Sequence, residues 1–278
     1  MYLCPLLFGQ VGGFYFLHEN IKIQLAKLRF FLNIRKLKNM KMIFKKEFKL
    51  FFSNITGYIV IALFVLANAL SLWVLPGQWN VFDSGYASLD ALFFLAPWLY
   101  LFLCPAITMR FFAEERAEGT LELLLTKPLS RFEIVGGKAL AGWVLVIIAL
   151  LPSLIWYLSV YILAEPMGNV DLGAFWGSWI GLLFLAAVYV AIGTFGSSLS
   201  SNQVVAFITS VVISFLLFYG FELVGSLFSG ETAYWLRQLG INEHYKSISR
   251  GVIDSRDLIY FVALTAGFIY LTTKQIKK

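Results

Sequence analysis

The chain has 278 residues, of which 59% are apolar and only 14% are charged. A soluble globular protein carries about 25% charged residues, so this composition excludes an ordinary soluble enzyme and indicates an integral membrane protein. The formal net charge of +6 would suit a nucleic-acid binder, but basic residues in a membrane chain mainly mark its cytoplasmic loops, and we expect no nucleic-acid partner. Two cysteines and two histidines, with no CxxC pair, predict no disulfide framework and no metal site.

Residues 1–39 fit the rest of the chain poorly. Met1–Leu17 is apolar but lacks a basic n-region and a small-residue cleavage site, so it is a poor signal peptide, and its proline and three glycines make it a weak span. Met40 and Met42 stand directly before a well-patterned segment. We therefore expect the true start at Met40 or Met42, with residues 1–39 an over-annotated extension. The alternative is a genuine disordered or amphipathic extension.

The segment Lys41–Phe52 is amphipathic at helical spacing. Phenylalanines gather on one side and lysines on the other, while Glu47 is a charged exception on the apolar side. Such a helix lies in the lipid headgroup layer with its lysines near anionic lipid, although an ordinary basic flank would look similar. The predicted membrane-interface residues are Lys41, Phe44, Lys45, Phe48, Lys49 and Phe51.

Six later stretches are long and apolar enough to cross a bilayer, which needs roughly 20 residues. They are Thr56–Leu75, Leu89–Met109, Ala139–Leu163, Ala174–Leu199, Val204–Val224 and Leu258–Thr272. With both termini inside, the inner segments hold 18 lysines and arginines and the outer connections hold four. This asymmetry predicts that both termini are cytoplasmic.

Four polar or helix-breaking residues inside these spans are candidates for a transport pathway or a subunit interface. Asn68 needs a partner in lipid, Pro97 and Pro105 free backbone carbonyls, and Glu222 is the one carboxylate embedded in the fifth span. Ordinary packing within the subunit is the competing interpretation for each. For Glu222, an interface role is favoured over a proton relay.

The connection between the second and third spans, residues 110–138, is the most informative stretch. Glu114, Glu118 and Glu122 recur at helical spacing, and Arg110 can pair with Glu114. Gly119 permits a turn, a short stripe of leucines follows, and Pro128 ends the segment. Such a stripe on a cytoplasmic loop needs a partner surface. A solvated, salt-bridged face is the main alternative. Metal binding or acid–base chemistry is disfavoured because no histidine or cysteine joins the carboxylates.

The sequence EERAEGTLELLLTKPLSRFEIVGGK resembles the intracellular coupling region of ABC type-2 transporter permeases, whose loop reads approximately E-E-R-x-x-G-T-L-E-x-L-L-x-x-P-x-S. The start IFKKEFKLFFSNITGYIVIALF and the later run SRGVIDSRDLIYFVALTAGFIYLT are also similar to this family, so the likeness covers about residues 40–278. Among these permeases, the chain looks most like the permease subunit of gliding-motility ABC transporters.

The resemblance implies an all-α permease of the bacterial inner membrane with the ABC type-2 exporter fold. It implies a separate ABC ATPase that binds ATP and Mg²⁺, a second permease subunit, and short re-entrant or interfacial helices in the outer connection, residues 225–256. The residues matching the family's ATPase-coupling motif are Glu114, Glu115, Glu118, Gly119, Thr120, Leu121, Glu122, Leu124, Leu125 and Pro128.

The residues independently indicate that the chain does not hydrolyse ATP. No GxxxxGK[ST] motif occurs, and Gly136-Gly137-Lys138-Ala139 lacks both the upstream glycine and the hydroxyl residue. Two other classes stay open. A lipid-modifying membrane enzyme would need a convergent His, Asp or Ser group, which the sequence does not offer. A structural subunit of an envelope motility or secretion machine would need no such group.

Overall fold

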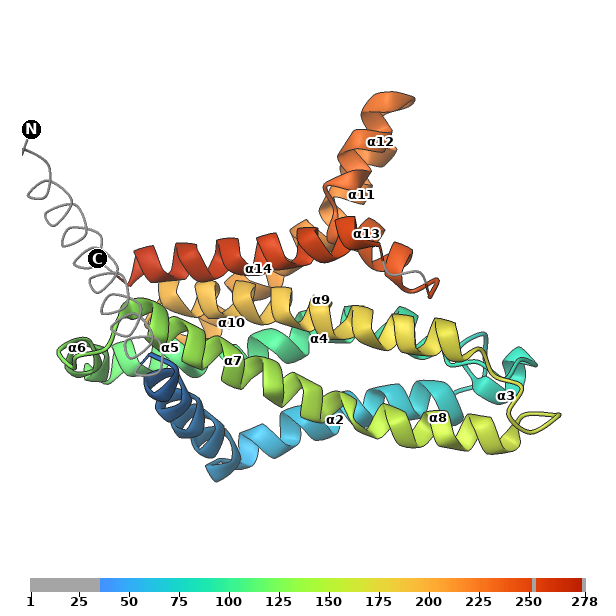
Figure 1. Cartoon of the computed structure of the whole chain (residues 1–278), viewed down its shortest axis with the longest axis horizontal. Coiled ribbons are helices and arrows are strands. Elements are labelled where there is room, and N and C mark those ends of the chain that lie inside the picture. The colour runs from blue at the N-terminus through green and yellow to red at the C-terminus, as the bar shows by residue number, and fades with distance from the viewer. Residues whose placement is uncertain (1–35, 252–253, 277–278) are drawn as a thin grey trace, which may run out of the picture.

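The computed structural model describes residues 36–251 and 254–276. The regular structure of these residues is entirely helical, which confirms the predicted all-α class for this part of the chain. Most helices lie along one common axis and form an elongated bundle (Figure 1). Two short helices, α5 and α6, lie at one end of this bundle and α3 lies at the other. These are called the α6 end and the α3 end below.

Five helical stretches among the described residues are long and apolar enough to cross a membrane, and they match the first five predicted spans. They are α2 (Ile55–Trp73), α4 with α5 (Asp90–Thr108 and Arg110–Ala117), α7 with α8 (Arg131–Leu150 and Pro152–Leu163), α9 (Leu172–Leu199), and α10, η1 and α11 (Gln203–Phe215, Leu216–Gly220 and Phe221–Ser226). The chain is therefore a multi-pass membrane protein.

The predicted sixth span, Leu258–Thr272, lies within α14 (Ser255–Gln275), which packs along α9 (Figure 1). α14 is long enough to span but is less apolar than the other five, because it carries three threonines and ends in Lys274 and Gln275. The sixth crossing stays a prediction.

Helix α9 is the centre of the bundle, with α4, α7, α10 and α14 packed around it. Two of its glycines allow this close approach. A Cβ atom at Gly193 would clash with the hydroxyl of Thr108, and one at Gly196 would clash with the hydroxyl of Ser210. α9 also fixes the junction of α4 and α5, where the Ser197 hydroxyl donates to the carbonyl of Met109 at 2.9 Å.

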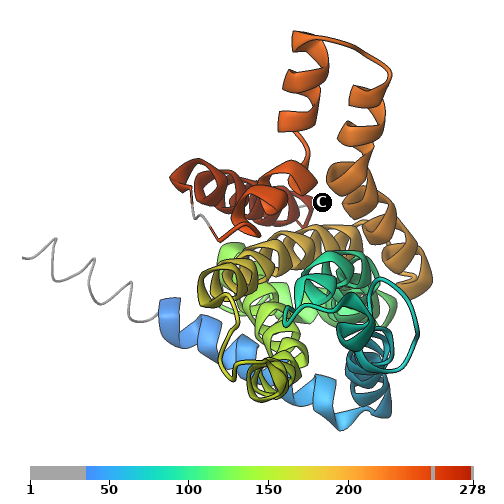
Figure 2. The ribbon, with the colours of Figure 1, turned by 90° about the vertical axis from the view of Figure 1, so that its right-hand side faces the viewer.

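The connection predicted to lie outside, residues 225–256, contains two short helices among its described residues, α12 (Glu231–Gln238) and α13 (Ile241–Ile248). α11 and α12 form a hairpin that stands out from the side of the bundle in both views (Figures 1 and 2). α13 returns to the bundle and packs on α9, where Gly181 faces Ile248. A short helix, α3 (Val81–Ser84), lies in the connection between the first two spans.

Residues 36–53 form a helix that runs steeply across the direction of α2 (Figures 1 and 2). The helix is interrupted at Asn54, and α2 begins at the next residue. The predicted start at Met40 or Met42 falls inside this helix. The remainder of the predicted extension, residues 1–35, lies outside the described residues.

Candidate functional site

At the α6 end, α5 continues the second span while still packed on α9, and a glycine then reverses the chain. The Arg110 guanidinium donates to both carboxylate oxygens of Glu114, at 2.9 and 2.7 Å, which confirms the predicted pair. Gly119 has a φ of +70°, a left-handed conformation that glycine adopts without steric cost. This residue turns the chain from α5 into α6 (Thr120–Leu125).

The leucines of α6 do not all face outward. Leu121 is only 8% exposed and belongs to the hydrophobic core, so the prediction that it is free for a partner is wrong. The reason is that α6 folds back against α5. Leu124 and Leu125 are partly buried against the same core. Leu123, which the sequence pattern did not single out, is 67% exposed. The outer edge of α6 therefore combines Leu123 with exposed Glu122, and the adjoining loops expose Glu118 and Pro128.

A buried charge cluster lies directly behind α5. The ammonium of Lys138, 1% exposed, is 2.7 Å from Glu47 Oε1 and 3.0 Å from Glu115 Oε1, and it donates to the carbonyl of Phe111 at 2.7 Å. Lys46 completes the cluster at 2.6 Å from Glu115 Oε1. Two lysines and two glutamates balance in charge, and Lys138 finds an acceptor for each of its three protons. The cluster joins α7, α5 and the helix of residues 36–53.

Two glycines of α7 next to Lys138 allow the helix of residues 36–53 to pack closely against α7. A Cβ atom at Gly136 would lie 2.9 Å from the end of the Met40 side chain, and one at Gly137 would lie 2.9 Å from Ile43. Asn39 adds a hydrogen bond to Glu133 at 3.2 Å. The Gly-Gly-Lys sequence therefore serves helix packing and an internal ion pair.

The predicted interfacial helix has a basic outer face. Its lysines Lys41, Lys45 and Lys49 are exposed. Its phenylalanines are only partly exposed, because Phe48 and Phe51 pack against the protein's own core as well as against other rings. The same partial burial applies to Phe44, which stacks on Phe48. The apolar side of this helix thus faces the bundle more than we expected, and its contact with lipid stays a prediction.

Asn68 and Pro105, two of the predicted pathway residues, are both buried in the bundle. The Asn68 amide donates to the carbonyl of Phe64 in its own helix at 2.9 Å. Neither residue lines the cavity described next, and a pathway role for them stays a prediction.

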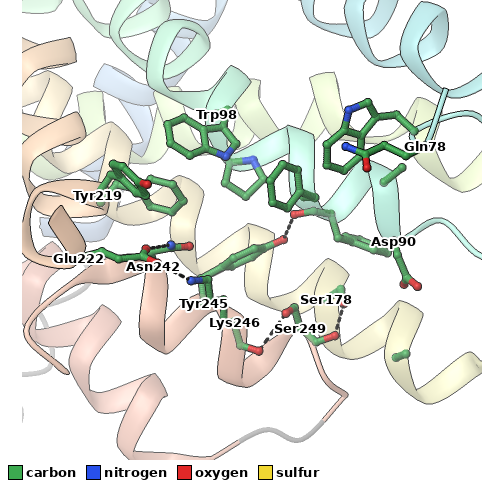
Figure 3. A pocket seen from close by; sticks show the side chains of 17 residues that line it. Gln78, Asp90, Trp98, Ser178, Tyr219, Glu222, Asn242, Tyr245, Lys246 and Ser249 are labelled. Carbon is green, nitrogen blue, oxygen red and sulfur yellow. Dashed lines mark hydrogen bonds and ion pairs between the residues drawn. The ribbon is translucent and has the colours of Figure 1, made fainter. Parts of the chain in front are cut away.

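The other two predicted residues, Pro97 and Glu222, line one cavity of about 790 Å³ near the α3 end. It lies between α4, η1, α13 and the loop after α2 (Figure 3). Seven aromatic side chains contribute to its wall. They are Trp79, Phe93, Phe94, Trp98, Phe218, Tyr219 and Tyr245.

Backbone irregularities on two elements shape this cavity. Pro97 has no N–H group, so the carbonyl of Phe93 one turn earlier lacks its helical donor. The hydroxyl of Tyr245, from α13, donates to that carbonyl at 2.7 Å (Figure 3). Burial raises the pKa of Tyr245, so the hydroxyl keeps its proton. Opposite, the π-helical turn η1 carries Phe218 and Tyr219, whose rings pack against Trp98 in T-shaped arrangements with centroid distances of 5.4 Å. Such π turns occur frequently at functional sites.

A polar group closes one end of the cavity. Glu222 accepts from the amide of Asn242 at 2.6 Å and from the ammonium of Lys246 at 3.0 Å (Figure 3). This carboxylate is therefore anchored to α13, in agreement with a structural role within the subunit. Asp90, at the start of α4, lies toward the opposite end of the cavity (Figure 3). No ion pair of Asp90 is formed with any residue in the described ranges.

Comparison with known protein families decides the identity of the chain. The sequence profile of the ABC-2 family transporter proteins matches residues 32–253, well over half of the chain. The chain belongs to the ABC-2 transporter family. No curated protein matches the sequence. Members of the ABC-2 family are membrane permease components of ABC transporters; they are not themselves catalytic and normally work with an ABC ATPase.

In this ABC-2 permease, the sequence signals for the α6 end were clear, while the residues behind it were missed. Glu47 stood out as a carboxylate on an apolar face, and Lys138 stood out within a glycine pair. Neither observation indicated that the two residues pair across 91 positions, which only the structure shows. Tyr245 and the π turn had no comparable signal in the sequence.

Proposed function

We propose that this chain is the membrane-spanning subunit of an ATP-driven exporter, and that a separate ATPase docks on α6. The family match supports a permease, and α6 carries the proposal for docking. It lies outside the spans at one end of the bundle, and its outer edge offers Leu123 and Glu122. Burying one leucine contributes roughly 1.5–3 kcal/mol, which is too little for a stable complex alone, so several contacts of this loop must contribute.

The buried charge cluster gives α6 a route to the spans. α6 is connected to α5 through Gly119, and α5 is tied through Glu115 to Lys138 on α7. Lys138 also holds Glu47, so the helix of residues 36–53 joins the same unit. A displacement of α6 by an ATPase would therefore move three elements together, since close-packed groups transmit strain. The permease itself performs no covalent chemistry in this proposal.

The orientation and partners follow from the same proposal. The α6 end would face the cytoplasm, because the lysine-rich helix of residues 36–53 lies there and basic loops favour that side. The complex would sit in the bacterial inner membrane and include a second permease subunit. The likeness of residues 114–138 and 249–272 to gliding-motility permeases supports that subgroup.

Co-purification tests the proposal. The full chain, extracted from its native membrane in mild detergent, should retain a chain with Walker A and B motifs, and the complex should hydrolyse ATP. Leu123→Ser with Glu122→Lys should release that chain, while Phe82→Ser, an exposed apolar residue on α3, should not. An ATPase that stays bound to the α6 variant would refute docking at α6. A complex with no ATPase would instead favour a structural subunit.

A further inference from the structure

We propose that the cavity between α4, η1 and α13 binds an amphiphilic organic cation, a molecule with an apolar body and an amine or other cationic centre. Binding of such a cation is a property of this chain by itself. That the cation is also the transported cargo rests on the exporter function proposed above.

The size of the cavity limits the occupant. A volume of about 790 Å³ falls within the range of pockets that enclose one small organic molecule, roughly 300–1,000 Å³. The wall also matches such ligands, because most of it is apolar and a few polar groups lie at its ends (Figure 3).

The aromatic wall favours a cation over an anion. Aromatic rings are electron-rich on their faces, and they attract ammonium-type groups placed over them. The side chain of Trp98, on α4, reaches the π turn, where its ring forms T-shaped contacts with Phe218 and Tyr219. Trp79 stacks on Phe94 with ring centroids 4.5 Å apart and forms a second aromatic surface in the same wall.

The charged groups of the wall point the same way. Three ionisable acid or base side chains line it: Asp90, Glu222 and Lys246. Lys246 lies 3.0 Å from Glu222, so these two charges offset each other. Asp90 is left as the excess formal charge; it is exposed at the rim of the cavity, in the first turn of α4, and within residues 36–251 and 254–276 it forms no ion pair. The wall is therefore net negative, although the chain as a whole is net positive.

The irregular backbone around the cavity supports a binding role. Within a membrane, irregular backbone is tolerated where it is buried in protein or lines a cavity. Here a proline in α4 and a π turn in the fifth span both border the same space, and Tyr245 satisfies the carbonyl that the proline leaves free. These two distortions therefore border the cavity without leaving the backbone carbonyl of Phe93 unpaired.

Tetraphenylphosphonium and tetraphenylborate test the proposal, because these ions match in size and shape and differ in charge. The full chain in lipid nanodiscs is dialysed against each ion, and binding to empty nanodiscs is subtracted. We expect saturable binding of the phosphonium at least roughly tenfold tighter than that of the borate. Asp90→Asn should weaken phosphonium binding about fivefold, and Trp98→Ala by a similar factor.

Glu231→Gln, on the protruding helix α12 and outside the cavity, is the matched control and should leave binding unchanged. Asp90→Asn keeps side-chain shape, so its effect does not depend on refolding of the wall. Equal binding of both ions, or no effect of Asp90→Asn, overturns the inference. Loss of the ATPase in the co-purification experiment with intact phosphonium binding would defeat the exporter proposal alone. A bound ATPase without phosphonium binding would defeat this inference alone.

Discussion

Replacing Lys138 by methionine should destabilise the protein strongly while keeping the side chain's length. The wild-type ammonium has three acceptors within 3.0 Å, and the side chains of Glu47 and Glu115 are 4% and 11% exposed. Without Lys138, two largely buried carboxylates share only the partly exposed Lys46. Removing one partner of a buried ion pair typically costs about 3–5 kcal/mol, because the remaining charge is left without compensation. For a domain of 150–250 residues, this corresponds to a fall in Tm on the order of 10 °C.

Thermal unfolding of the purified chain in detergent, followed by tryptophan fluorescence, measures this effect. Lys127→Met is the matched control on the α6 end, since Lys127 is exposed, and its change should stay within about 0.5 kcal/mol. The double variant Glu47→Gln with Lys138→Met should recover part of the loss, because one uncompensated charge is removed. A Lys138→Met protein as stable as wild type, or a double variant less stable than the single one, would refute the reasoning about this cluster.

Two further predictions concern single contacts. Burial would lower the pKa of Lys46, but the hydrogen bond and charge of Glu115 outweigh it, and the pKa is raised above its usual 10.5. Because the folded-state pKa is the higher one, the charged Lys46 stabilises the fold fully below pH 10.5, and this stabilisation is lost as pH rises through the folded-state pKa. The Tm of the wild type should therefore fall more steeply in that range than the Tm of Lys46→Gln. Parallel curves of Tm against pH would contradict this. Tyr245→Phe should cost about 1–3 kcal/mol by leaving the carbonyl of Phe93 unpaired, and less in a Pro97→Ala background, which restores an N–H donor. Equal costs in both backgrounds would exclude this explanation.

The spans and the shape of the α6 end could be predicted because they depend on local pattern. Long apolar runs fixed five spans, and Gly119 with its flanking glutamates fixed the turn into α6. Leu121 is an example of what local pattern cannot predict. Its position on an apolar stripe could not reveal whether that stripe faces a partner or the chain's own α5, because this depends on the angle at which α6 folds back.

The cavity could not be predicted from the sequence for a different reason. Pro97 and Glu222 were each recognisable as unusual in a span, but the space they share is enclosed by elements up to 152 positions apart, as the bond from Tyr245 to Phe93 shows. The π turn also follows no sequence rule, since its residues read as ordinary helix. Pairings of this kind become visible only when the helices are placed together.

Cross-linking from α6 tests the central claim, an ATPase docked at this end, most directly. Leu123→Cys and Phe82→Cys are each made in a chain that lacks Cys4 and Cys104, and native membranes are treated with a short thiol-to-amine cross-linker. The account predicts that Leu123→Cys, and not Phe82→Cys, links to a chain carrying a Walker A motif. A link formed from Phe82→Cys, or none from Leu123→Cys in membranes where the complex hydrolyses ATP, would contradict it.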